Sequence, residues 1–467
     1  MVAAAPLVLA ARGAASAHAA EIPFTDPIAA FVALRGDGLS VLLDSAAPGP
    51  DTGRYTIIGV DPIEWIRTGW SDAFERLRAL TAGLPRTRAP AGWPFAPALM
   101  GSLGYELRRA LEHVPSRHRD EVGPADLVFG LFDTVIVFDV IDRRAAVLAY
   151  DLDRRRPQPT FRCRDTAQRI VNSKPLIDLS YIPDCQWNSD RTPEAYEACV
   201  RRVLDYIRAG DIYQANFTQR WVARRPADIE PFDLYRRLRA LSPAPYGAFI
   251  QDGAGNAILS ASPERFLSLA ADRRIDTKPI KGTRPRALDP AEDRANAESL
   301  RSSAKDRAEN LMIVDLLRND LGRVAEIGSV AVPELNSLHS FASVHHLVST
   351  VTARLRRGLG PIDLLRACFP GGSVTGAPKI RAMEIIDELE AGRRGPYCGA
   401  IGWIGLDGAM ELSIAIRTLT VTADRVVAQA GGGIVADSDP GAEYQEALTK
   451  ARPLLGTLDS AFRAGAG

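Results

Sequence analysis

A lysine followed by a glycine is the chain's best candidate nucleophile. Lys281 lies within residues 279–286, between an apolar dipeptide and Gly282. The prolines near both ends exclude a helix, so a strand that runs into a turn is expected. Guanidinium groups at Arg284 and Arg286 would favour the neutral, nucleophilic amine and attract an anionic ligand. On these eight residues alone, a solvated basic loop is the better-supported alternative.

A long predicted helix carries a carboxylate on an inward face. Residues 305–321 hold apolar side chains nearly all round the helix, which predicts that it is buried. Glu309 lies three and four residues before Met312 and Ile313, on the same stripe. A carboxylate in a core must be paired, protonated or bound to metal. A buried ion pair and a metal site fit this pattern equally well.

The last predicted helix carries two more carboxylates. An Asp-Pro pair at 439–440 caps it, and Glu443, Glu446 and Lys450 share one face by their spacing. A surface ladder of salt bridges is the usual reason for such a pattern. If these glutamates instead share a cation with Glu309, Mg²⁺ fits, because it takes oxygen ligands and keeps water molecules that a ligand can replace.

Other residues suit an anionic substrate. Glu264, in a turn, could supply a proton, and Arg417, within a predicted strand, could hold an anion. The glycine-rich segments 369–379 and 431–433 could bring backbone N–H groups close to that anion. The alternatives are the start of a helix, with a proline at its first position, and a bulged strand.

Composition bounds the class of protein. The 467 residues are 46% hydrophobic and 24% charged, as in an ordinary globular enzyme. Lys+Arg and Asp+Glu both number 57, so no net charge attracts nucleic acid or an anionic membrane. No apolar run reaches the ~18 residues of a membrane span. Five widely spaced cysteines favour a reducing compartment, and we expect a cytoplasmic protein. The alanine-rich first twenty residues are expected to be a tail or first strand, not a signal peptide.

Strands dominate the elements that must position these residues. The first third is expected to be mostly sheet, because helical signals are sparse there apart from the stretch near 71–82. A capped helix is expected to follow Thr192 and to end at Gly210. The predicted strands are 39–46, 55–59, 127–140 (one long strand or a pair), 145–151, 211–217, 245–250, 257–260, 399–404, 411–420 and 425–430.

Ordered motifs from residue 190 to 457 resemble one enzyme family. They are Ser262-Pro263-Glu264-Arg265-Phe266, Pro279-Ile280-Lys281-Gly282-Thr283, Lys305-Asp306-Arg307-Ala308-Glu309-Asn310-Leu311-Met312, Val344-His345-His346-Leu347-Val348-Ser349, the loop 371–379, and Gly431-Gly432-Gly433-Ile434-Val435-Ala436-Asp437-Ser438. In this order they resemble the chorismate-utilising enzymes, and among them component I of the aminodeoxychorismate synthases. Residues 42–46 and 55–59 match more loosely.

Two positions separate members of this family. Where Lys281 stands, anthranilate synthases carry alanine and aminodeoxychorismate synthases carry lysine. Where Gln214 stands, isochorismate and salicylate synthases carry a lysine that activates water. The resemblance therefore implies that ammonia replaces the C4 hydroxyl of chorismate, giving 4-amino-4-deoxychorismate for 4-aminobenzoate and folate synthesis. Anthranilate synthase component I is the alternative. An inactive tryptophan-sensing or scaffold homologue is a third possibility, against which the intact set of acidic and basic residues argues.

The resemblance implies an α+β fold, in which two large β-sheets pack together, helices lie outside and the active site occupies the cleft. Residues 1–180 would form an N-terminal region like that of anthranilate synthase component I, and residues 190–457 the chorismate-binding catalytic region. Asp44 departs from the glutamate usual in the tryptophan pocket of anthranilate synthases, so feedback inhibition by tryptophan does not follow from the resemblance.

The resemblance also implies roles at the site. Lys281 adds at C2 of chorismate while Glu264 protonates the departing hydroxyl, and ammonia then attacks C4 and expels the lysine. Mg²⁺ bound by Glu309 and Glu446, with Glu443 acting through water, fixes the ring carboxylate. The remaining site residues implied are His346, Gln214, Thr283, Ser373, Tyr397, Arg417, Gly431, Gly433 and Lys450.

Ammonia is implied to come from a separate protein. No cysteine lies in a Gly-x-Cys-x-Gly turn, so the chain lacks the usual nucleophile for glutamine hydrolysis. The partners implied are chorismate and a glutamine amidotransferase subunit.

Overall fold

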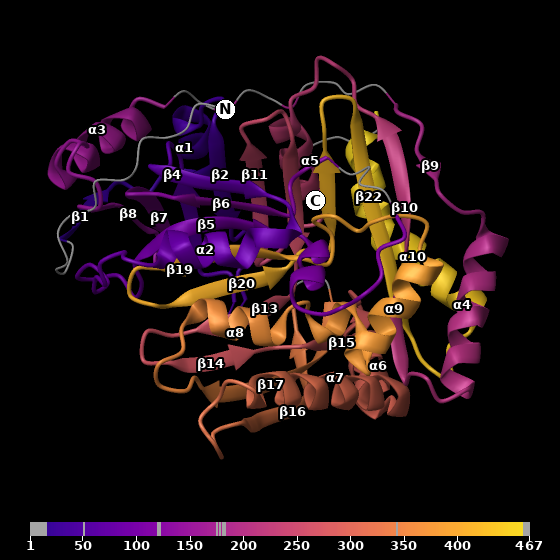
Figure 1. Cartoon of the computed structure of the whole chain (residues 1–467). Helices are drawn as coiled ribbons and strands as arrows, with labels where there is room; N and C mark the ends of the chain where they lie inside the picture. Colours follow the sequence, from indigo (N-terminus) through magenta and orange to yellow (C-terminus); the bar gives the residue numbers. More distant parts are fainter. Residues whose placement is uncertain are drawn as a thin grey trace.

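Two antiparallel β-sheets with helices outside form the protein (Figure 1). The computed structural model describes residues 16–460, except 50–51, 119–122, 174–175, 177–178, 180–183 and 342–343. Within this part of the chain, no helix combines the length and apolar composition needed to span a membrane.

The first sheet has twelve strands. In spatial order they are β1 (Ala17–Ile22), β8 (Arg144–Tyr150), β7 (Thr134–Asp139), β3 (Tyr55–Gly59), β2 (Leu39–Asp44), β11 (Tyr246–Asp252), β12 (Ala257–Ser262), β21 (Thr418–Val421), β22 (Arg425–Ile434), β10 (Gln214–Arg224) and β18 (Gly376–Ala377), with β9 (Asn188–Ser189) beside β10.

The second sheet has ten strands. They are β15 (Ile280–Pro285), β17 (Val344–Arg354), β14 (Arg274–Thr277), β13 (Arg265–Leu269), β20 (Met410–Ile414), β19 (Ala400–Gly405), β5 (Pro97–Leu103), β6 (Leu127–Leu131) and β4 (Glu64–Thr68), with β16 (Ala331–Ser340) beside β17.

Helices cover the outer faces of both sheets. They are α1 (Pro27–Leu34), α2 (Ala73–Thr81), α3 (Pro159–Val171), α4 (Pro193–Arg208), α5 (Pro231–Leu241), α6 (Pro290–Ser302), α7 (Ala304–Gly322), α8 (Pro361–Cys368), α9 (Lys379–Leu389) and α10 (Pro440–Leu455), with 3-10 turns at Trp70–Asp72, Tyr105–Ala110, Gly372–Val374 and Gly456–Leu458.

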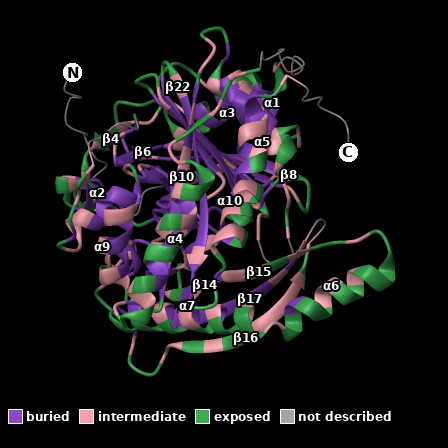
Figure 2. Cartoon of the chain, turned by 90° about the vertical axis from the view of Figure 1, so that its right-hand side faces the viewer, coloured by how far each residue is buried: buried purple, intermediate pink, exposed green. Residues whose placement is uncertain are grey.

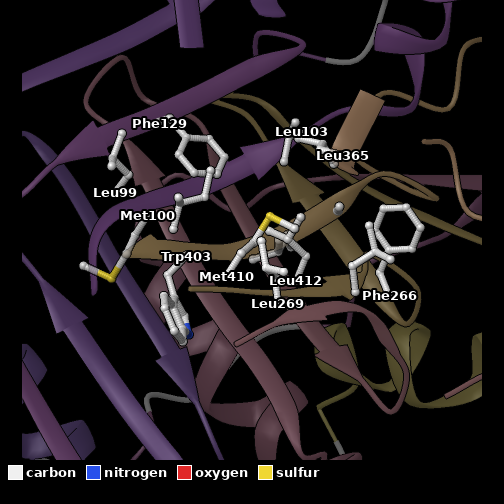
Figure 3. Close-up of a cluster of buried hydrophobic side chains, with 14 of the residues drawn as sticks. Leu99, Met100, Leu103, Phe129, Phe266, Leu269, Leu365, Trp403, Met410 and Leu412 are labelled. Carbon is white, nitrogen blue, oxygen red and sulfur yellow. The ribbon is translucent and has the colours of Figure 1, made fainter. Parts of the chain in front are cut away.

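Alternation along the strands builds two large apolar layers. On β2, Val41 belongs to the cluster between the two sheets, whereas Leu42 packs with the cluster beneath α1, α3 and α5. Side chains of a strand point alternately to opposite faces, so one strand supplies both layers. Figure 3 shows part of the layer between the sheets, where Met100 and Trp403 come from neighbouring strands. The buried residues gather on the strands (Figure 2).

Both sheets draw strands from both of the sequence regions expected above. In the first sheet β2 pairs with β11, and in the second β5 pairs with β19. The chain crosses between the sheets within residues 127–140, because β6 lies in the second sheet and β7 in the first. This segment is therefore a pair of strands, one of the two forms expected for it.

The first third is mostly sheet, as predicted, and also contains the short helix α1, which Asp26 caps. Two sequence predictions about these elements are wrong. The stretch 411–420 is two strands, because the chain leaves the second sheet after Ile414 and enters the first at Thr418. Helix α7 is buried on one face only, since Ile313 is fully buried but Leu311 remains 45% exposed. An outer helix covers its sheet with a single face, so apolar residues elsewhere on it stay exposed.

Helix α10 depends on its cap. The Asp439 side chain accepts a hydrogen bond of 2.9 Å from the backbone N–H of Ala442. Asp439→Ala should destabilise the first turn of α10 by about 1 kcal/mol, and amide hydrogen exchange there should become roughly fivefold faster. Asp439→Asn keeps an accepting oxygen and should exchange like the wild type. Equal exchange in Asp439→Ala and the wild type would contradict this account.

Candidate active site

The candidate nucleophile lies on a strand that is broken by a bulge. Lys281 is half-buried on β15, and the register between β15 and β17 shifts between Lys281 and Thr283. Gly282, between them, has φ +73°, which a glycine adopts without strain. A bulge re-aims neighbouring side chains and is frequent beside active sites. The expected strand at this position is therefore present, with the bulge setting the direction of Lys281.

Gln214 and the glycines of β22 lie against Lys281. A Cβ atom added to Gly433 would lie 2.7 Å from Gln214 Nε2 and 3.3 Å from Lys281 Nζ. Gln214 is fully buried, and neither its Nε2 nor its Oε1 has a hydrogen-bond partner among the described residues. An unsatisfied buried amide is costly, so these atoms suit a bound polar ligand. The pairing of β22 with β10 is regular through all three glycines, which excludes the bulged strand considered above.

The two arginines that follow Lys281 form ion pairs with aspartates. Arg284 forms an ion pair with Asp306, at 3.3 Å, and Arg286 forms one with Asp293, at 2.8 Å. Their charges are therefore balanced by carboxylates on and beside α6 and α7. A spacing of three and five residues placed these side chains near Lys281 in sequence but could not show their partners.

Glu264 is held in its acid form by burial. Its side chain lies at the end of β12, next to Ser373, and is almost fully buried. Burial raises the pKa of Glu264 to about 7, although the Ser373 hydroxyl and the Lys281 ammonium act to lower it. A carboxyl group with a pKa near neutrality is suited to donate a proton. The structure thus brings the expected acid and the expected nucleophile together.

The three glutamates on the helices converge below β22. A Cβ atom added to Gly432 would lie 3.1 Å from Glu443 Oε2 and 3.4 Å from Glu446 Oε1. Glu309, on α7, faces the same space, because Lys305 Nζ lies 4.0 Å from Glu309 Oε1 and 3.8 Å from Glu443 Oε1. Burial raises the pKa of both Glu309 and Glu443, and the nearby carboxylates add to the rise.

Glu446 differs from Glu309 and Glu443 in the direction of its pKa shift. Desolvation acts to raise the pKa of Glu446, but the Lys450 ammonium, 2.6 Å from its Oε1, lowers it overall. Lys450 also donates a hydrogen bond of 2.9 Å to the carbonyl of Gly431. Glu446 is therefore the most readily ionised of the three helical carboxylates.

These carboxylates suit a hard cation. No cluster of three or more histidine, cysteine, aspartate or glutamate side chains with metal-binding geometry occurs among the residues described. A positive ion already occupies the space, however, because the Lys305 ammonium lies within 4.0 Å of two carboxylates from different helices. Mg²⁺ needs only one or two protein carboxylates, since water and substrate complete its octahedron. The donor set therefore fits Mg²⁺ better than a preformed cage for a larger cation.

The Arg417 guanidinium lies at the junction between the two sheets. Arg417 lies where the chain passes from β20 to β21 and has φ +52°, a left-handed conformation that turns it out of the strand direction. Among the described residues it forms no ion pair, although Tyr397 and Glu446 contribute to its electrostatic environment. A partly buried guanidinium without a carboxylate partner is a natural site for an anion.

His346 lies beside Thr283 and close enough to Arg417 to feel its charge. Its Nδ1 lies 3.0 Å from Thr283 Oγ1, and burial together with the Arg417 charge lowers the pKa of His346. A neutral imidazole can then accept or donate a hydrogen bond without adding charge. All of the site residues expected from the sequence thus lie in one connected region, whereas Arg284 and Arg286 are held by other partners.

Comparisons with known proteins show the family of the chain. The family of chorismate binding enzymes matches residues 42–456. The chain belongs to this family. It is 45% identical to aminodeoxychorismate synthase component 1 of Klebsiella aerogenes, over 79% of this chain and 78% of that protein. It is 40% identical to anthranilate synthase component 1 of Streptomyces coelicolor, over 92% of this chain and 86% of that protein.

Solved structures confirm the expected fold of this chorismate binding enzyme. Anthranilate synthase component I from Streptococcus pneumoniae superposes with a TM-score of 0.76 at 31% identity, covering 92% of this chain and 98% of that one. The menaquinone-specific isochorismate synthase of Escherichia coli shares the fold, with a TM-score of 0.72 at 18% identity and 96% of each chain covered. The predicted α+β architecture of two packed sheets is confirmed.

A further cavity lies between the sheets, away from the catalytic residues. Its volume is about 520 Å³, and Asp44, Tyr55 and Trp403 are among its lining residues. The Asp44 carboxylate accepts hydrogen bonds from Arg239 Nε, at 2.6 Å, and from the Tyr235 hydroxyl, at 2.9 Å. The charge of Asp44, the position that departs from anthranilate synthases, is therefore already balanced within the chorismate binding enzyme.

The sequence did not predict the buried Arg394, which links two segments that carry expected site residues. Arg394 is 1% exposed and donates to both carboxylate oxygens of Glu390, at 2.9 and 2.7 Å. The same guanidinium donates to the carbonyls of Val374, at 2.7 Å, and Asn216, at 2.6 Å. It thereby joins the loop that carries Ser373 to the strand that carries Gln214. The i,i+4 spacing of Glu390 and Arg394 was visible in the sequence but resembles an ordinary surface pair.

The glycine-rich loop at 369–379 has a structural role. Lys379 donates to Asp320, at 2.6 Å, and to the carbonyls of Cys368 and Pro370, both at 3.0 Å. Pro378 is the N-cap residue of α9, one position earlier than expected. The loop therefore begins a helix and carries Ser373 into the site.

Arg394→Lys should test the joining role. Lysine keeps the charge but cannot donate to three separate partners in the guanidinium geometry, so the free energy of unfolding should fall by about 2 kcal/mol in urea denaturation. Arg381→Lys is the control, because Arg381 forms only half-exposed ion pairs and its change should be within about 0.5 kcal/mol. Equal losses of unfolding free energy in the two variants would show that the hydrogen bonds of Arg394 stabilise the protein no more than an exposed ion pair does.

Proposed function

We propose that this chorismate binding enzyme is the aminating component of an aminodeoxychorismate synthase. Ammonia replaces the C4 hydroxyl of chorismate, and the enolpyruvyl group is retained. The observation that carries the proposal is Lys281, which lies beside the buried acid Glu264 and the unsatisfied amide of Gln214. The relatives named aminodeoxychorismate synthase component 1 support it.

The chemistry follows from the positions of these groups. Once the Lys281 ammonium has lost a proton to solvent, its amine forms a bond to C2, the ring double bonds shift, and the C4–O bond breaks as Glu264 gives its proton to the leaving hydroxyl. Ammonia then forms a bond to C4, and the bond between C2 and Lys281 breaks. One difficult substitution becomes two easier ones, and chorismate plus ammonia gives the amino product plus water.

The cationic side chains would hold the two carboxylates of chorismate. Arg417, with Tyr397, would bind the enolpyruvyl carboxylate, and the ring carboxylate would be surrounded by Lys450, Thr283, Ser373 and the backbone of Gly431 and Gly433. Glu309 and Glu446 would hold Mg²⁺, with Glu443 contributing through water. When bound, the metal neutralises the ring carboxylate and fixes its orientation. His346 orients the substrate through its contact with Thr283.

A separate glutamine amidotransferase subunit supplies ammonia in this proposal. The designation component 1 of the similar synthases is consistent with a second component. The chain alone should therefore use ammonium salts and fail to use glutamine until such a subunit is added.

Product analysis tests the function directly. Wild-type protein with chorismate, Mg²⁺ and ammonium should yield 4-amino-4-deoxychorismate, identified by mass. Anthranilate synthase activity, the alternative, would release pyruvate and yield anthranilate. In ammonia-free buffer, intact-protein mass spectrometry should show a chorismate-derived adduct on the peptide that contains Lys281, and Lys281→Ala should lack it. An adduct that persists in Lys281→Ala would assign the nucleophile to another residue.

The acid role of Glu264 predicts a pH dependence. Its raised pKa, about 7, keeps the proton in place below that pH, so kcat/KM should fall as pH rises through about 7. Glu264→Gln cannot donate the proton, so its residual activity, roughly 10²- to 10⁴-fold lower, should lack this alkaline limb. Glu309→Gln is the matched control and should lose activity while keeping the limb. An unchanged limb in Glu264→Gln would assign the acid elsewhere.

A further inference from the structure

The ammonium group of Lys305 lies between two carboxylates of different helices. Its Nζ is 4.0 Å from Glu309 Oε1 and 3.8 Å from Glu443 Oε1. Both distances exceed the roughly 2.7–3.2 Å of an N–H···O hydrogen bond, so charge alone holds the lysine there. The Lys305 side chain is 44% exposed, whereas the side chains of Glu309 and Glu443 are 13% and 6% exposed. A half-exposed cation thus lies beside two largely buried anions.

The other polar groups beside these glutamates have partners of their own. Glu446 is already balanced by Lys450, at 2.6 Å, and the hydroxyl of Ser438 donates to Glu443 Oε1 at 2.6 Å. A serine hydroxyl satisfies a hydrogen bond but supplies no charge. Lys305 therefore lies between Glu309 and Glu443, in the space where a divalent cation would meet both helices. More distant ammonium groups also act on them, that of Lys281 on Glu309 and that of Lys450 on Glu443.

We propose that Lys305 is a displaceable internal counter-ion for the metal site. Its ammonium balances Glu309 and Glu443 while the metal is absent and moves into solvent when a divalent cation binds. The inference rests on the proposed function, because it takes these glutamates to hold a divalent cation. Lysine suits the exchange, since its flexible stem lets a strongly hydrated head group reach water at little cost.

Lys305 lowers the metal affinity of the free enzyme. A divalent cation must displace the ammonium, so part of its attraction to the carboxylates is spent on breaking existing ion pairs. A substrate carboxylate adds negative charge and favours the doubly charged ion over the singly charged lysine. Metal binding is thereby coupled to substrate binding.

Direct metal binding tests the role of Lys305. The full chain is titrated with Mn²⁺, without chorismate, and free Mn²⁺ is measured by electron paramagnetic resonance. Lys305→Met removes the charge and keeps the stem, and it should bind Mn²⁺ with a roughly fivefold lower Kd than the wild type. Lys305→Arg keeps the charge and should remain close to the wild type. Arg307→Met is the matched control, because Arg307 is exposed on the same helix two residues further on and faces another direction.

The outcomes separate this inference from the proposed function. A Kd in Lys305→Met equal to or higher than that of the wild type overturns the role of Lys305. An equal gain in Arg307→Met also overturns it, because net charge would then be the cause. If wild type and Lys305→Met both fail to bind Mn²⁺ even with chorismate present, the metal site itself is wrong and both proposals fall. Mn²⁺ binding that is the same in both proteins leaves the proposed metal site standing and removes only the counter-ion.

Discussion

Balance between buried charges is the condition on which the site depends. Glu264, Glu309 and Glu443 are largely buried, and each would be unstable as an anion without a nearby cation, whereas the neighbouring Glu446 side chain is 53% exposed. Lys281 stabilises the ionised forms of Glu264, Glu309 and Glu446 at once. Burial nevertheless raises the pKa of Glu264 to about 7, whereas the Lys450 ammonium lowers the pKa of Glu446. Burial and neighbouring charges thus give these glutamates different pKa values, which suit them to different roles.

The two-sheet fold makes this concentration of charge possible. Gln214 and Gly433 are far apart in sequence but lie beside each other because β10 and β22 pair antiparallel. Arg417 turns towards the site because the chain changes sheets at that residue. Arg394 then fixes the loop of Ser373 to β10 through buried carbonyl groups. Strands and a buried guanidinium position the site more rigidly than exposed loops could.

The same architecture serves more than one reaction. Anthranilate synthase component I and an isochorismate synthase superpose on this chain, so the fold does not by itself select the chemistry. In our proposal the choice lies in one side chain at the centre of the site. A lysine amine at position 281 can form and release a covalent bond, whereas an alanine at that place leaves ammonia to act without it.

Local patterns in the sequence determined a large part of this protein. Thr192 caps α4 and Asp439 caps α10 as predicted, because a cap is formed by residues within one turn. Residue type and motif also selected the candidate lysine, the candidate acid and the three helical glutamates, which the structure places close together. The features that the sequence did not predict depend on contacts between segments that are distant in the chain. Only the tertiary structure could show that Arg284 and Arg286 are bound by aspartates and that 411–420 divides between two sheets. The same holds for the contacts of Arg394 with two distant carbonyl groups and for the place of Lys305 between two glutamates. Sequence spacing fixes which side chains share a face of one helix or strand, whereas the partner of a long charged side chain depends on which other element folds against it.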